Sequence, residues 1–139
     1  MGSRPTPIFS AGAESEKVSV NIGYVDLGQI DLLVNEGFYS TRTDFIRTAI
    51  RNQLERQDAS LRSSTQRHAF ELGQKNISRA ELEILLSTRK ILHVRVIGLA
   101  TIANDVPAQL ALKTIGSIRV LGALRMSAEV RKALRDRIL

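Results

Sequence analysis

Polar and apolar side chains alternate strictly over Lys17-Val18-Ser19-Val20-Asn21-Ile22. Successive side chains of a β-strand point to opposite faces, so this pattern predicts a short strand with two different faces. The apolar face consists of Val18, Val20 and Ile22. The polar face consists of Lys17, Ser19 and Asn21.

A lone strand of this length needs a partner, because its backbone N–H and C=O groups must find hydrogen bonds. Helical patterns follow it, so the simplest partner is the same strand of a second copy. Two antiparallel copies would form a ribbon of the kind that enters the major groove of B-DNA. Lys, Ser and Asn side chains suit hydrogen bonding to base edges there. Taken alone, the strand is equally typical of an ordinary amphipathic edge strand.

Two helical patterns favour the DNA-binding interpretation. The first covers about residues 26–35 with an apolar stripe, and Gly37 ends it. The second begins at Thr41, a good N-cap, and Asp44 completes a weak capping box. Its apolar ridge predicts a helix face in a dimer core and consists of Phe45, Ile46, Ala49, Ile50 and Leu54. Free N–H groups at its start, beside Arg42, would bind a DNA phosphate.

Residues 17–57 resemble a ribbon-helix-helix domain of the Arc, MetJ and CopG type. The most specific stretch is Glu36-Gly37-Phe38-Tyr39-Ser40-Thr41-Arg42-Thr43-Asp44-Phe45-Ile46-Arg47-Thr48-Ala49-Ile50, which is similar to the turn and second helix of CopG-like regulators. The resemblance implies an intertwined homodimer that binds double-stranded DNA. It implies base contacts by Lys17, Ser19 and Asn21. It also implies phosphate contacts at the start of the second helix by Thr41, Arg42 and Thr43. The dimer core would contain Val18, Val20, Ile22, Phe45, Ile46, Ala49 and Ile50.

The C-terminal half contains a 24-residue repeat. Val94-Arg95-Val96-Ile97-Gly98 recurs as Ile118-Arg119-Val120-Leu121-Gly122, and a more degenerate copy precedes them at Phe70-Glu71-Leu72-Gly73. Each copy predicts a short strand, a glycine turn, a second apolar stretch and a helix, and the helices would begin near Ser78, Asp105 and Ser127. A copy of this size cannot bury its apolar face alone, so about three should stack. Their exposed end strands would pair with another subunit.

The predicted fold class is therefore α+β, in four segments. Residues 1–16 are a disordered arm, and residues 17–57 are the DNA-binding and dimerisation domain. Residues 58–66 are a polar linker into which the second helix could extend. Residues 67–139 are the repeat domain, which would serve higher homo-oligomerisation or sensing.

Charge favours an anionic partner, since the 139 residues carry a formal net charge of +6. Residues 63–139 contain thirteen Lys or Arg and six Asp or Glu, whereas residues 17–62 contain six of each. The excess would either contact the DNA backbone or keep a surface soluble. The absence of Cys fits a reducing compartment, and no apolar run approaches the length that spans a membrane. We expect a cytoplasmic, nucleoid-associated protein without membrane contact.

Catalysis has little support in the sequence. His68 and His93, the two histidines, do not stand in a spacing typical of a metal cluster or of a nucleophile and base. Gly98 and Gly122 are isolated rather than part of a phosphate-binding loop. We predict that the protein is not an enzyme and has no catalytic residues, no metal and no cofactor. The sequence leaves a small-molecule effector open.

Three functions fit these features. The first is a sequence-specific transcriptional regulator that the C-terminal domain assembles further. A repressor is the expected role, and the sequence leaves activation open. The second is an antitoxin, although antitoxin tails tend to be short and disordered until bound. The third is a DNA-anchored scaffold that polymerises through its repeats.

Overall fold

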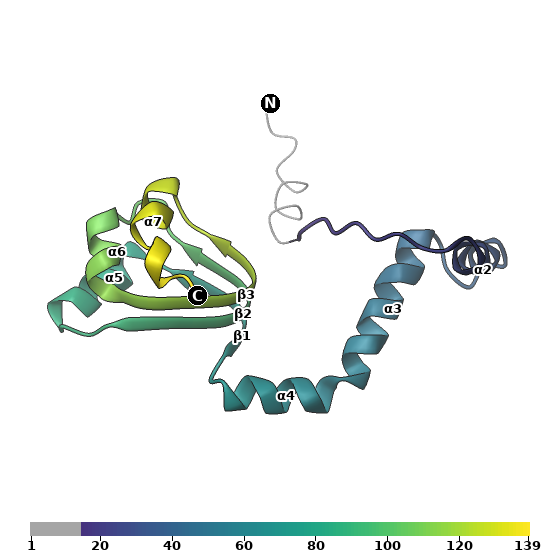
Figure 1. Ribbon diagram of the computed structural model, residues 1–139, viewed down its shortest axis with the longest axis horizontal. Coiled ribbons are helices and arrows are strands. Elements are labelled where there is room, and N and C mark those ends of the chain that lie inside the picture. The colour runs from purple at the N-terminus through teal and green to yellow at the C-terminus, as the bar shows by residue number, and fades with distance from the viewer. Residues whose placement is uncertain (1–14) are drawn as a thin grey trace. The chain divides into compact units, whose positions relative to one another are not determined.

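The computed structural model describes residues 15–139, so residues 1–14 of the predicted arm lie outside the described residues. The chain divides into two compact units, residues 1–62 and residues 63–139, which are described separately. The described part contains six α-helices and one three-stranded sheet, a mixed α and β fold (Figure 1).

Helices α2 (Tyr24–Asn35) and α3 (Arg42–Arg56) form the described helical pair of the first unit. Gly37, at φ +87°, ends α2 as predicted. Beyond the helix, the N–H of Phe38 donates to the carbonyl of Leu33 at 3.0 Å, which satisfies a free carbonyl of the last turn. The ring of Tyr39 then packs edge-on against Phe45, with centroids 5.0 Å apart. These contacts fix the turn between the two helices.

The start of α3 is capped by Thr41, as the sequence predicts, with one difference. The hydroxyl of Thr41 accepts from the N–H of Asp44 at 3.0 Å. The carboxylate of Asp44 should reach back to the N–H of Thr41 in a standard capping box. It accepts instead from the N–H and the hydroxyl of Ser40, at 3.0 and 3.2 Å. The hydrogen bond to the Asp44 carboxylate therefore comes from Ser40, the residue before the N-cap, and not from Thr41.

The segment predicted as a linker forms helix α4 (Asp58–Arg67). It contains neither Gly nor Pro, and Arg62 pairs with Asp58 one turn away at 3.0 Å. Such i,i+4 ion pairs support an exposed helix. Gln57 separates α4 from α3, and Ala69, at φ +54°, follows its end.

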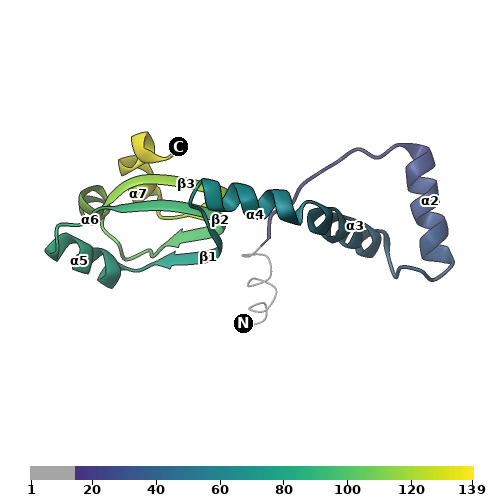
Figure 2. The same cartoon turned by 90° about the horizontal axis from the view of Figure 1, so that it is seen from below.

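The second unit consists of three successive strand-and-helix segments. Strands β1 (Glu71–Ile77), β2 (Leu92–Ile102) and β3 (Ile115–Arg125) lie parallel in that order. Helices α5 (Arg79–Ser87), α6 (Ala108–Thr114) and α7 (Ala128–Ala133) follow them in turn, and a 3-10 turn, η1 (Arg135–Arg137), comes last. Figures 1 and 2 show each helix following the strand that precedes it in the chain.

Two of the three predicted helix starts are correct. Ser78 and Ser127 cap α5 and α7 with their side chains. Asp105 does not begin α6, which starts at Ala108 after Pro107 as its N-cap. The residue before a proline is held away from helical geometry, so Val106 cannot lie inside a helix that Asp105 begins.

The pairing of β2 with β3 has the same 24-residue offset as the sequence match, because Val94 lies opposite Ile118 and Gly98 opposite Gly122. Gly73 lies opposite Gly98, so β1 is offset by one residue more. These three glycines do not end the strands. They lie inside them at φ between +120° and +136°, and the strands bend sharply (Figure 1). A side chain at Gly98 or Gly122 would overlap the preceding glycine's carbonyl oxygen, which excludes every larger residue.

The second unit has its own hydrophobic core. Inward-facing strand residues pack against the three helices, and the buried cluster consists of Ile77, Leu82, Val94, Val96, Ala100, Ile102, Val106, Leu110, Ala111, Ile115, Ile118, Val130 and Leu134. Alternate residues of the strands, among them Arg95 and Arg119, lie side by side on the other face. Thus the sheet buries one face and leaves the other accessible.

Candidate DNA-binding interface

The predicted ribbon residues are exposed on both faces. Residues 15–23 contain neither helix nor strand in the single chain, and Lys17, Ser19 and Asn21 are all exposed. The apolar face is just as accessible, since Val18 and Val20 are 76% and 74% exposed. The described part of one chain supplies no strand to pair with this segment and no surface to cover it.

The seven predicted dimer-core residues are likewise not buried within one chain. Phe45 is half-buried, whereas Ile46 and Ile50 are exposed along α3. Ile30 is the one buried residue in the described part of this unit. Beside it lies an open apolar hollow of about 510 Å³, lined by Asp26, Gln29, Ile30, Leu32, Leu33 and Phe45. The unit therefore presents an apolar surface that residues 15–62 leave uncovered.

The start of α3 holds the predicted phosphate-contacting residues together. Thr41 caps the helix, and in the described structure the backbone N–H groups of Arg42 and Thr43 donate to no protein acceptor. Free N–H groups at the positive end of a helix dipole can bind an anion. Asp44 also lies in this first turn, and its negative carboxylate would repel an anion bound at these amides.

The Arg42 side chain makes an ion pair between the two helices. Its guanidinium donates to both carboxylate oxygens of Asp31, at 2.7 and 2.8 Å, and so ties α3 to α2. This hydrogen bond lowers the pKa of Asp31 and raises the pKa of Arg42. The guanidinium thus joins the two helices, and the backbone amides stay available to an anion.

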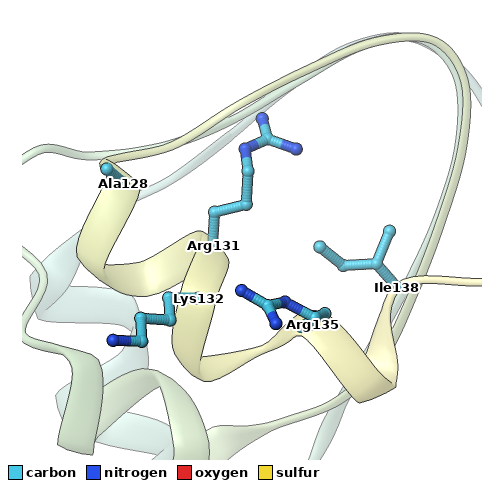
Figure 3. A pocket seen from close by; sticks show the side chains of 5 residues that line it. All are labelled: Ala128, Arg131, Lys132, Arg135 and Ile138. Carbon is cyan, nitrogen blue, oxygen red and sulfur yellow. The ribbon is translucent and has the colours of Figure 1, made fainter.

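A basic cluster that the sequence did not single out lies at the end of the second unit. Arg131, Lys132 and Arg135, with Ala128 and Ile138, line an open hollow of about 420 Å³ (Figure 3). Arg131 also donates to the carbonyl of Leu124 at 2.8 Å. The spacing of Arg131 and Arg135, one helical turn apart, was the available signal. Three cations around one hollow suit a polyanion.

The outward row of the sheet is also partly basic. The guanidinium of Arg95 lies 4.7 Å from the ring centroid of Phe70, and that of Arg119 lies 5.8 Å from it. Arg95 also donates to the carbonyl of His68 at 2.7 Å. These contacts hold the two guanidiniums over an aromatic face.

Neither histidine belongs to a cluster of possible metal ligands. Across residues 15–139 no three His, Asp or Glu side chains come close enough to hold a metal ion. His93 Nδ1 lies 2.8 Å from the hydroxyl of Ser117 on the neighbouring strand. None of the helices in this range combines the length and apolar character needed to cross a membrane.

Sequence comparison places this geometry in context. The profile of a Ribbon-Helix-Helix transcriptional regulator family matches residues 13–131, which is most of the chain. No curated protein and no solved structure matches it.

Proposed function

This chain belongs to the ribbon-helix-helix transcriptional regulator family, and we propose that it is a repressor that reads the DNA major groove as a homodimer. In this proposal, residues 17–22 of two chains pair as an antiparallel ribbon. Lys17, Ser19 and Asn21 face the bases, and the amides at the start of α3 clamp flanking phosphates.

The observation that carries the proposal is the uncovered apolar surface of the first unit. Val18 and Val20 are exposed on one side of the segment that precedes α2, and Ile46 and Ile50 are exposed along α3. An exposed apolar surface of this extent marks an interface. A second copy would bring both a strand to complete the ribbon and side chains to fill the hollow beside Ile30.

The second unit would join these dimers on DNA and add contacts to the backbone. It packs its own core within one chain, which supports a folded assembly domain rather than a tail that orders on a toxin. The cationic side chains of its basic hollow would bind DNA phosphates regardless of the base sequence. A protein with this role would be associated with the nucleoid.

Replacing Asn21 with Ala tests the proposal directly. Asn can pair bidentately with adenine, so the variant should lose about 1 to 3 kcal/mol of specific affinity, while nonspecific affinity changes little. The site is first selected from random DNA with the parent protein, and both affinities are then measured at one salt concentration.

The matched control is Asn35→Ala. Asn35 is also exposed but belongs to the end of α2, outside the segment 17–22 that would form the ribbon. It should bind the selected site as the parent does. If Asn21→Ala also binds that site with unchanged affinity and preference, this position does not read bases and the proposed ribbon is wrong.

A further inference from the structure

The two outer edges of the sheet in the second unit differ. On the β3 side, Ile138 bridges to Ile118, and the N–H of Leu139 donates to the Ile118 carbonyl at 2.8 Å. Near the other end of β3, Arg131 donates to the carbonyl of Leu124. The chain therefore covers two points of this edge, Ile118 and Leu124, with its own C-terminal residues.

The β1 edge has no such cover. Its ladder with β2 extends as far as a bond from the N–H of Ala103 to the carbonyl of Ile77. No other described segment pairs with the β1 backbone. Leu72, the second residue of this strand, is 78% exposed. An unpaired edge with an exposed apolar side chain is a template for another strand.

Since the C-terminal residues occupy part of the β3 edge, the β1 edge is the more open of the two. Pairing of two identical open edges closes after two copies, which is the usual two-fold arrangement. The bend at Gly73 then sets the register. Two bent strands lie along each other only where their bends coincide, and a two-fold axis midway between the two Gly73 residues exchanges the arms on either side of it.

We propose that the β1 edge pairs antiparallel with the β1 edge of a second copy, with Gly73 opposite Gly73 of the partner subunit. The inference rests on the assembly role in the proposed function and names the surface that performs it. A Cβ atom added to Gly73 would have no other atom within 4 Å. A Cβ atom added to Gly98 or Gly122 would overlap the backbone of the neighbouring strand. The partner's backbone would occupy the space beside Gly73.

Charges agree with this register. Glu71 and Lys75 stand two residues before and after Gly73 and form an ion pair within the chain at 3.1 Å. The two-fold axis places Glu71 opposite Lys75 of the partner subunit, and Lys75 opposite Glu71 of the partner subunit. Opposite charges directly across a strand pair stabilise it. Four alternating charges thus meet at the bend.

Disulfide trapping tests the register, because the chain has no cysteine of its own. Two full-length copies with tags of different size are co-expressed, one with Leu72→Cys and the other with Gln74→Cys. These positions lie directly opposite each other in the proposed register, within the roughly 4.4 to 6.8 Å between Cα atoms that a disulfide needs. Mild oxidation should convert most mixed pairs to a reducible covalent dimer.

The matched control uses Leu121→Cys with Ala123→Cys, which occupy the same two rows on β3. This combination should give several-fold less covalent dimer. Equal yields from the two combinations, or no covalent dimer from the first, would overturn the proposal. Covalent multimers from Leu72→Cys with Leu121→Cys in one chain would indicate stacking of β1 on β3 instead, and would also overturn it.

Charged side chains on an edge strand can also prevent association. Exchanging the charges of Glu71 and Lys75 shows whether they stabilise the strand pair or protect the edge from pairing. Glu71→Lys in both cysteine copies should lower the covalent yield several-fold. Glu71→Lys in one copy and Lys75→Glu in the other should restore it, because opposite charges then meet only between copies. An increased yield in the first case would mean that these charges protect the edge, which contradicts the proposal.

The two proposals fail separately. Asn21→Ala added to the cysteine copies should leave the covalent yield unchanged while specific DNA affinity falls. Failure of trapping with normal DNA reading would reject the β1 pairing alone.

Discussion

At the residue scale, Arg42 shows how one side chain can have a structural role at a predicted binding position. Its guanidinium is held by both oxygens of Asp31, and both groups remain partly exposed to solvent. The sequence places Arg42 beside the free amides of α3, but the partner on α2 is eleven residues away and depends on the angle between the helices. The amides of Arg42 and Thr43 remain available.

Replacing Asp31 with Asn should weaken the attachment of α3 to α2 in a pH-dependent way. Hydrogen bonding to Arg42 lowers the pKa of Asp31 below its ordinary value of 3.8. A lowered pKa in the folded state stabilises the fold above the unfolded pKa, and this stabilisation is lost as the pH falls through the folded pKa. Thermal unfolding of parent and variant should therefore differ at pH 7 and pH 5.

The same difference should shrink once the pH falls well below 3.8. Asp26→Asn, a change of the same kind in the first turn of α2, is the control for removal of a charge. A difference at pH 7 that persists undiminished in acid would show that the ion pair is not its cause.

At the element scale, local chemistry predicted most helix ends but not the path of the strands. Thr41, Ser78 and Ser127 cap their helices because each offers a hydroxyl at a chain reversal. Gly98 looked like a turn in sequence, since a lone glycine signals a break. Its neighbours across the sheet are also glycines, so the strand bends and still pairs. The bend depends on the register that places the three glycines opposite one another, and the sequence of one strand alone does not determine that register.

Of the candidate site, the structure confirms the helix cap at Thr41. The two faces that the alternation over residues 17–22 indicates stay a prediction. The basic cluster around Arg131 and Arg135 was missed because its hollow forms only when α7 and the C-terminal residues come together. The helical nature of residues 58–67 was missed because their polarity resembles a linker, although no Gly or Pro interrupts them.

Shortening Ile50 to Ala should test the exposed face of α3. Ile50 is 54% exposed in one chain, so its loss would cost little if the chain worked as a monomer. In the proposed dimer core it should cost about 2 to 5 kcal/mol and lower the unfolding midpoint in a concentration-dependent manner. Arg51→Ala, one residue along the same exposed helix, is the control. Comparable small effects of both changes would place Ile50 outside the interface.

At the scale of the whole molecule, the two units divide the work of the proposed regulator. The first has one buried residue in its described part and balanced charge, and in the proposal the contacts with a second copy complete its core. The second has a complete core and carries the basic excess. Its first strand is the proposed self-association edge, and its basic hollow lies between α7 and the C-terminal residues. Assembly through β1 would leave that hollow free for DNA.

Lys132→Gln with Arg135→Gln should therefore reduce the salt dependence of DNA binding. Each phosphate contact releases counterions and contributes about 0.9 to the slope of log affinity against log salt, so two lost contacts per chain make the slope shallower. Arg89→Gln with Lys90→Gln removes the same charge from an exposed turn after α5 and serves as the control. Titrations on multi-site DNA over a salt series should show the larger change for the first pair. If both variants change the slope equally, the net charge of the second unit affects DNA binding without direct contact at the hollow. If neither variant changes the slope, the second unit does not contact the DNA backbone.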